Sequence, residues 1–167
     1  MTSDPRANPD PARPVPEAAN LGVARPPLVY LGSIALGVIL HFARPVSLLP
    51  RGVSPRFGAA VVLLAIGLFL FAVRTFRAAG TPVPGNRPTT TIVRTGPYRF
   101  SRNPIYLAFS LLQIGIALWV NSLWLVLALL AAVAVMSLVV IPREERYLEA
   151  RFPPEYSAYR ASVRRWL

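Results

Sequence analysis

The sequence contains no cysteine, no lysine and only one histidine, and acidic residues are scarce in it. Without cysteine, disulfides, thiolate metal sites and cysteine nucleophiles are all excluded. The eighteen basic residues are all arginine, against seven acidic residues, and none of the acids lies between Glu17 and Glu144. No nucleophile–base pair, metal-ligand cluster or glycine-rich phosphate loop is recognisable. The sequence therefore points to no metal site and identifies no catalytic residue.

A net charge of +11 is compatible with nucleic-acid binding, but no nucleic-acid-binding fold signature accompanies it. The arginines cluster at the ends of apolar runs, as they do in membrane proteins with positively charged cytoplasmic loops. The hydrophobic fraction is 54% and the mean hydropathy is +0.47, both above the usual range of soluble proteins. We expect an all-α integral membrane protein with no nucleic-acid partner.

Four apolar runs predict about four transmembrane helices, at residues 28–43, 57–76, 105–120 and 123–141. The first run would extend only roughly 24 Å as a helix, against a hydrocarbon core of about 30 Å. It either spans with help from snorkelling arginines or forms a re-entrant or thinned span. The last two runs are separated only by Asn121 and Ser122, which predicts a helical hairpin, and Pro142 is expected to end it.

The predicted topology follows from the distribution of arginines. The N-terminal tail, the loop 78–103 and the C-terminal tail share one side, which with Arg74 and Arg77 at the end of the second run holds fifteen arginines, whereas the other side holds three. The positive-inside rule places the arginine-rich side in the cytoplasm, here of a bacterial inner membrane. Residues 1–25 lack periodicity and predict a disordered tail, and residues 26–167 form one membrane domain.

The C-terminal tail is predicted to form two helical pieces, separated at Pro153 and Pro154. In the first piece, Glu144 shares a stripe with Leu148 and Phe152, so it is expected to point toward the protein. Glu145 lies on a neighbouring stripe and is expected to point more toward solvent.

The second piece carries an aromatic stripe flanked by arginines, formed by Tyr156, Tyr159, Val163 and Trp166. This pattern predicts an interfacial amphipathic helix that lies on anionic lipid.

The segment 89–106 is basic, aromatic and constrained by two X-Pro steps, Gly96-Pro97 and Asn103-Pro104. Such a loop suits an anionic or zwitterionic ligand at a membrane surface, and we expect Arg102 to bind substrate. The hairpin returns Glu144 to the same face as Asn103. Tyrosine hydroxyls, an amide and a carboxylate are the groups needed to bind a nucleoside that carries an amino acid. The alternative is that these arginines and tyrosines only fix topology.

The spacing of several motifs resembles the isoprenylcysteine carboxyl methyltransferase and phospholipid methyltransferase superfamily. The resemblance covers residues 80–165: Ile92-Val93-Arg94-Thr95-Gly96-Pro97-Tyr98, then Arg102-Asn103-Pro104-Ile105-Tyr106, a hairpin, Glu144-Glu145, and a tail from Phe152 to Tyr159. Those proteins are integral membrane enzymes that use S-adenosylmethionine.

The resemblance implies a set of cofactor-binding residues: Thr90, Ile92, Val93, Tyr98, Asn103, Pro104, Tyr106 and Glu144. Asn103 stands where a histidine is commoner, and it cannot titrate near neutral pH. The prenylcysteine enzymes also carry an arginine one turn before the glutamate, for the substrate carboxylate, and Val140 stands there. The resemblance therefore supports the cofactor but not a prenylcysteine substrate.

The expected function is methyl transfer from S-adenosylmethionine to a lipid-soluble or amphiphilic acceptor at the cytoplasmic membrane face. The alternative is a non-enzymatic membrane scaffold or small subunit that binds lipid headgroups. Glu144 distinguishes the two, because a headgroup scaffold has no use for an inward carboxylate.

Overall fold

The computed structural model describes residues 25–50, 55–81 and 89–167, and within these ranges the regular structure is helical, without strands. The all-α prediction is therefore confirmed for this part of the chain. The predicted disordered tail up to residue 24 lies outside the described residues, as do residues 51–54 and part of the loop 78–103, at residues 82–88.

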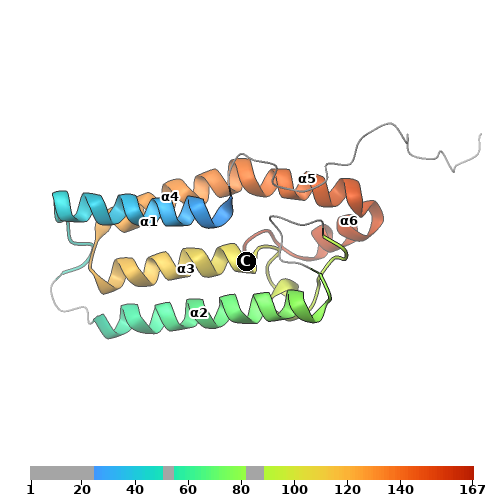
Figure 1. Ribbon diagram of the computed structural model, residues 1–167, viewed down its shortest axis with the longest axis horizontal. Helices are drawn as coiled ribbons and strands as arrows, with labels where there is room; N and C mark the ends of the chain where they lie inside the picture. Colours follow the sequence, from blue (N-terminus) through green and yellow to red (C-terminus); the bar gives the residue numbers. More distant parts are fainter. Residues whose placement is uncertain (1–24, 51–54, 82–88) are drawn as a thin grey trace, which may run out of the picture.

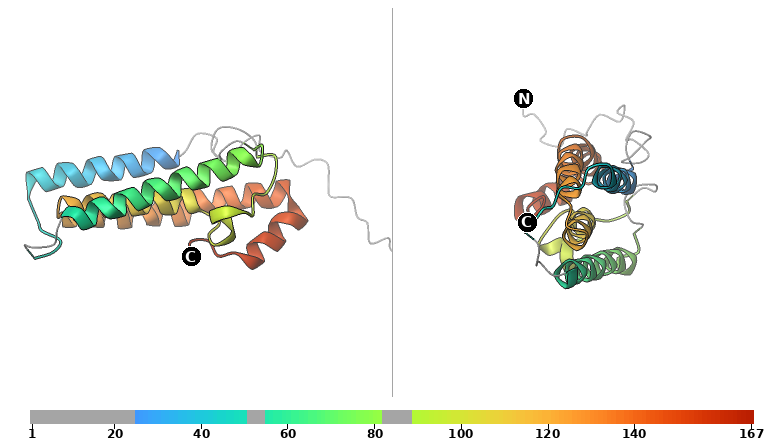
Figure 2. Two further views of the ribbon diagram at one scale, coloured as in Figure 1. Left: turned by 90° about the horizontal axis from the view of Figure 1, so that it is seen from below. Right: turned by 90° about the vertical axis from the view of Figure 1, so that its left-hand side faces the viewer.

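Four helices lie side by side along the long axis of the molecule (Figure 1). They are α1 (Pro26–Ala43), α2 (Pro55–Ala78), α3 (Pro104–Trp119) and α4 (Leu123–Val135). The first three begin at a proline, whose fixed φ suits the first helical turn. Seen end-on, α3 lies between α2 and α4 (Figure 2); α2 packs most extensively on α3, and α1 on α4.

In the described residues, three helical stretches are long and apolar enough to cross a bilayer, against the four predicted. Helix α1, helix α2 and the continuous helical stretch Leu123–Arg151 each qualify as a membrane span, and α3 is a shorter apolar helix of 16 residues. Their outer surfaces expose large apolar side chains, such as Phe42 at 81% and Leu138 at 77%, which is the exposure that lipid tails stabilise. Helix α1 runs without interruption over 18 residues, so the re-entrant alternative is not observed. The protein is an integral membrane protein.

The prediction that Pro142 ends the hairpin is wrong, because the helix continues past it. Helix α4 passes through a π-helical turn at Met136–Val140 into α5 (Ile141–Arg151). Proline has no N–H, so an α-helix would leave the Leu138 carbonyl without its donor at this point. The wider turn, in which the Ile141 N–H donates to the Met136 carbonyl, lets the helix pass the proline.

The other end of the bundle is closed by a tight turn at Asn121, which has a φ of +52°. The Asn121 side-chain oxygen accepts hydrogen bonds from the backbone N–H groups of Leu48 and Leu49, at 3.1 and 2.9 Å. The hairpin tip is thereby tied to the connection between α1 and α2. It lies at the end opposite the segment 89–103, as the sequence predicted.

The chain ends by folding back onto the bundle. The break between α5 and α6 (Pro153–Ser162) falls at Phe152, as predicted from the two prolines. Beyond α6 the chain returns to the start of α3 (Figure 1), where the Arg102 N–H donates to the Arg164 carbonyl at 2.9 Å.

Candidate functional site

A cavity of about 230 Å³ lies at the end of the bundle where α5, α6 and the segment 89–103 meet. Its walls are mostly aromatic and aliphatic, and its polar side chains include those of Arg102, Asn103, Tyr106, Glu144, Glu145 and Tyr147. Pro26 and Pro27, at the start of α1, complete the lining. Such a pocket, apolar with a few convergent polar groups, is the usual form of a small-molecule site.

The structure brings most of the predicted site residues to this cavity. The lining includes Ile92, Val93, Tyr98, Arg102, Asn103, Pro104, Tyr106 and Glu144. Thr90 is different, because its side chain is exposed and its neighbours Thr89 and Thr91 line the cavity instead. The Thr90 N–H donates to the Thr81 hydroxyl at 3.0 Å, which fixes this part of the segment.

A short 3₁₀ helix, η1 (Gly96–Arg99), places Tyr98 in the core. It begins at Gly96, whose φ is +57°, and a β-carbon there would lie 2.7 Å from the Thr75 hydroxyl oxygen. Only glycine meets both conditions without strain. The Tyr98 ring then packs edge-on against Phe76, with ring centroids 4.7 Å apart.

Glu144 and Tyr106 form the polar centre of the cavity. The Tyr106 hydroxyl donates to the Glu144 carboxylate at 2.6 Å, joining α3 to α5. Glu144 is 7% exposed, so its charge is largely removed from water. The prediction that Glu144 points toward the protein is confirmed.

The expectation that Glu145 points more toward solvent is wrong, because Glu145 is as buried as Glu144, at 7% exposure. Its carboxylate pairs with Arg102 at 2.9 Å and with Arg165 at 2.6 Å. These arginines come from the segment before α3 and from the chain end, so the phase of α5 alone could not reveal them. Burying a carboxylate requires such partners.

Three buried polar atoms on cavity-lining residues have no hydrogen-bond partner: the hydroxyl groups of Tyr98 and Tyr147, and Nε of Arg102. Buried polar groups in folded proteins nearly always have partners, so these are groups that a ligand would satisfy. Burial raises the pKa of the Tyr98 phenol above its ordinary value, so the hydroxyl keeps its proton and can donate.

The aromatic stripe of helix α6 packs against the site and not against lipid. The prediction that this helix lies with its stripe on anionic lipid is therefore wrong. Tyr156 and Tyr159 are 2% and 5% exposed and pack with Ile92, and Val163 is partly buried against the same cluster. Trp166 is also partly buried, and its indole N–H donates to the Ser137 hydroxyl at 3.3 Å. An amphipathic pattern shows that one face must be buried, but not whether lipid or protein buries it.

The Tyr159 hydroxyl donates to the Tyr98 carbonyl at 2.7 Å in a buried setting. We expect Tyr159→Phe to lower the free energy of unfolding by about 0.5–1.5 kcal/mol, the contribution of one neutral hydrogen bond. Thermal unfolding of the detergent-purified protein measures this. The control is Tyr156→Phe, which removes a 3.3 Å contact of Arg102 with the Tyr156 hydroxyl, longer than usual for such a bond; Arg102 keeps its ion pair with Glu145, so this change should cost less. A larger loss for Tyr156→Phe would contradict the assignment.

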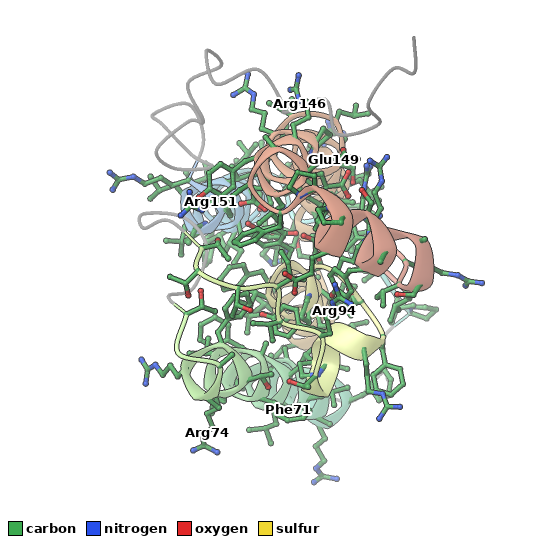
Figure 3. All side chains as sticks on the ribbon, turned by 90° about the vertical axis from the view of Figure 1, so that its right-hand side faces the viewer. Phe71, Arg74, Arg94, Arg146, Glu149 and Arg151 are labelled. Atoms are coloured by element: carbon green, nitrogen blue, oxygen red, sulfur yellow. The ribbon has the colours of Figure 1, made fainter. Side chains whose placement is uncertain are left out.

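Exposed arginines rim this end of the bundle. Figure 3 looks directly at it and shows Arg74 of α2 and Arg146 of α5 projecting outward on opposite sides. Two others hold the segment 89–95 in place: Arg151 donates to the Thr89 carbonyl at 3.2 Å, and Arg94 pairs with Glu155 at 3.7 Å. Arginines of α2, of the segment 89–103 and of the C-terminal tail therefore lie around the cavity.

Sequence reasoning missed three features of the site. Tyr147 and the stacked pair Phe69 and Phe109 line the cavity, and Arg165 stands behind Glu145. Phe69 and Phe109 lie within apolar helices, where nothing in the sequence separates a cavity wall from a lipid-facing or core residue, and Tyr147 lies on the charged helix α5. Val140, at the position of the substrate arginine in the prenylcysteine enzymes, is a buried core residue at 1% exposure.

Comparison with known proteins supports the methyltransferase resemblance. An uncharacterized protein of Haemophilus influenzae is 36% identical over 63 residues, which are 38% of this chain and 100% of that protein. The cobalt-zinc-cadmium resistance protein CzcN of Cupriavidus metallidurans is 36% identical over 73 residues, or 44% of this chain and 33% of CzcN. No solved structure matches the chain significantly. The phospholipid methyltransferase family model matches residues 53–155, which include α2, α3, α4, α5 and most of the cavity lining. The chain belongs to the phospholipid methyltransferase family of integral membrane methyltransferases.

Proposed function

We propose that the protein transfers a methyl group from S-adenosylmethionine to a lipid-soluble or amphiphilic acceptor at the cytoplasmic face of a bacterial inner membrane. Family membership supplies the reaction class. The observation that carries the rest is the cavity at the arginine-rich end of the bundle. There the buried Glu144 carboxylate, unpartnered phenols and apolar walls meet at one site.

The residues around the cavity fit the chemical groups of the cofactor. Ile92, Val93 and Tyr98 offer an apolar wall to a purine ring, and Glu144 offers a charged acceptor to a hydroxyl or ammonium group. Asn103 and the Tyr147 phenol add neutral polar groups beside them. When bound, S-adenosylmethionine supplies an electrophilic methyl group on a sulfonium, and the leaving group is neutral.

The acceptor is proposed to occupy the part of the cavity nearer the bundle interior, entering laterally between helices. Phe69 and Phe109 form an aromatic wall there, with ring centroids 5.5 Å apart, which suits an acyl or other apolar chain. Arg102 is proposed to contact the polar head of the acceptor. Because Val140 is buried and apolar, we do not propose a prenylcysteine carboxylate as the acceptor.

The chain's own contribution is chiefly positioning and exclusion of water. A reaction with a neutral leaving group needs little acid–base assistance, and fixing the reacting atoms in line supplies much of the rate enhancement. The name of CzcN refers to metal resistance, but the described residues of this chain contain no group of three His, Cys, Asp or Glu side chains that could hold a metal ion. The proposal therefore rests on methyl transfer alone.

The test is cofactor binding followed by transfer. Calorimetry on the protein in lipid nanodiscs should show binding of S-adenosylmethionine and of S-adenosylhomocysteine. Membranes that contain the protein should then transfer the labelled methyl group of S-adenosylmethionine to molecules in the lipid-extractable fraction. Membranes with the Glu144→Gln variant should move far fewer. Absence of cofactor binding by the wild-type protein would overturn the proposal, and binding of anionic lipid alone would favour a headgroup-binding scaffold.

The proposed topology has its own test. The end of α2, the start of α3 and α6 all line the cavity, which supports a topology in which they share one side of the membrane. We expect a reporter fused after Leu167 to be active only if it is of a kind that functions in the cytoplasm. The matched control is a fusion within the connection between α1 and α2, after Pro50, which should show the opposite pattern. Periplasmic activity of the fusion after Leu167 would contradict the topology.

A further inference from the structure

The last residues of the chain contact the site from behind the cavity wall. Residues 156–167 lie beyond the family match, which ends at residue 155. Arg165 is not part of the cavity lining, but it contacts α5, which lines the cavity, and the π turn that precedes α5. It reaches Glu145 on α5, and its Nη1 donates to the Ser137 carbonyl in the π turn at 3.5 Å.

The contact with Glu145 is bidentate. Arg165 donates from Nε to one carboxylate oxygen at 3.0 Å and from Nη2 to the other at 2.6 Å. Arg102 approaches the first of these oxygens at 2.9 Å. Glu145 is thus held between two guanidinium groups, of which one, Arg102, lines the cavity. A bidentate pair of this kind compensates the charge of the carboxylate and also fixes its orientation, because the guanidinium and carboxylate groups are coplanar.

The backbone beside Arg165 holds the same loop. The Arg164 carbonyl accepts from the Arg102 N–H at 2.9 Å, and the Arg165 carbonyl accepts from the Asn103 side-chain amide at 2.9 Å. Both Arg102 and Asn103 line the cavity. The backbone carbonyls of the chain end therefore hold both polar residues that precede α3: Arg102 by its backbone N–H and Asn103 by its side-chain amide.

Arg102 has donor capacity to spare. Its Nη1 contacts Glu145 and the Tyr156 hydroxyl, while its Nε is buried without a partner. It is the one arginine among the residues that line the described cavity. An anionic group on a ligand would pair with it there.

We propose that Arg165 is a positioning residue, which acts through Glu145 to hold Arg102 in place for an anionic group of the ligand. The inference deepens the proposed function and rests on it. A carboxylate of the cofactor and a phosphate of the acceptor offer the same chemistry to Arg102, so the experiment has one arm for each.

The experiment compares Arg165→Gln with a matched control, Arg164→Gln. The Arg164 side chain is exposed, and only its backbone carbonyl takes part in the contacts above. The first arm measures the affinity of S-adenosylhomocysteine by calorimetry, and the second measures the affinity of glycerol 3-phosphate. We expect Arg165→Gln to weaken one of them by about 5- to 30-fold, or about 1–2 kcal/mol, which lies within the coupling of residues in one ion-pair network. Arg164→Gln should change neither by more than about twofold.

The two arms identify the anion. Loss confined to S-adenosylhomocysteine assigns it to the cofactor, and loss confined to glycerol 3-phosphate assigns it to the acceptor. Arg165→Lys should recover only part of the affinity, because lysine keeps the charge but not the fork. If Arg165→Gln leaves both affinities within about twofold of the wild-type value, the proposal is wrong.

A double-mutant cycle separates positioning from general stabilisation. In an Arg102→Gln background, Arg165→Gln should weaken ligand binding no further, although it still lowers the melting temperature. Equal losses of ligand affinity in both backgrounds would show a merely structural role and overturn the inference. If the wild-type protein binds neither ligand, the proposed function fails. The melting temperatures then still test the network, since strictly additive effects of the two substitutions would contradict the coupling.

Discussion

Glu144→Gln is expected to weaken binding of S-adenosylmethionine by roughly 10- to 150-fold, because hydrogen bonds to a charged group contribute about 1.5–3 kcal/mol. Glu144 is buried at the cavity, and the Tyr106 hydroxyl fixes its carboxylate at 2.6 Å. The amide keeps the size of the side chain but removes the negative charge that the proposed contact needs. Calorimetry on the correctly folded variant measures the loss.

Glu149→Gln is the matched control, because it makes the same chemical change on the same helix. The Glu149 side chain is 45% exposed and pairs with Arg160 at 3.1 Å outside the cavity lining. Surface pairs of this kind contribute little, so cofactor affinity should stay within about twofold. If Glu144→Gln also stays within that range, Glu144 does not bind the cofactor.

Tyr106→Phe helps to interpret the result. The substitution removes the hydroxyl that orients Glu144 and leaves the carboxylate in place. We expect a milder loss, about 2- to 13-fold, since a typical hydrogen bond contributes about 0.5–1.5 kcal/mol. A loss as large as that of Glu144→Gln would indicate that the hydroxyl itself contacts the ligand.

The order of the helices and most of their boundaries follow from the sequence, because apolar runs set the length of a membrane helix and prolines favour its first turn, and both are local features. The run predicted at residues 105–120 is observed at Pro104–Trp119, and the run at 57–76 is observed at Pro55–Ala78. The hairpin then fixes which end of the bundle carries Glu144. These features need no knowledge of distant contacts.

The features that the sequence did not reveal depend on contacts between distant segments. Glu145 is buried because Arg165, 20 residues further on, returns to it, and helical phase says nothing about such a return. Pro142 predicted a helix end, but the π turn before it provides another way to accommodate the missing N–H. In both cases the local sequence is compatible with two outcomes and does not say which one the structure adopts.

A close approach of α2 to α3 depends on two glycines, Gly58 of α2 and Gly115 of α3. A β-carbon on Gly58 would lie 2.5 Å from the Trp119 backbone nitrogen and 2.8 Å from the Gly115 carbonyl oxygen. A β-carbon on Gly115 would lie 2.8 Å from the Val62 backbone nitrogen. Small residues at such crossings let membrane helices pack backbone to backbone.

Gly58→Val is therefore expected to destabilise the protein by about 3 kcal/mol or more, the upper end of the usual overpacking penalty. The clash is with backbone atoms, so a change of side-chain rotamer cannot relieve it, and α2 has to move away from α3. Helix α2 also carries Phe69 and Phe76 of the cavity wall, so ligand binding should weaken as the packing loosens. Thermal unfolding in detergent measures the first effect and calorimetry the second.

Gly67→Val supplies the control, because it introduces the same side chain into the same helix. A β-carbon on Gly67 would meet no atom within 4 Å, so the new side chain would extend into open space, which lipid fills in the membrane. Helix propensity favours most residues over glycine, so we expect the melting temperature to stay the same or rise slightly. A similar destabilisation by Gly58→Val and Gly67→Val would mean that valine in α2 is harmful in itself. In that case the close contact between α2 and α3 would not be what holds the bundle together.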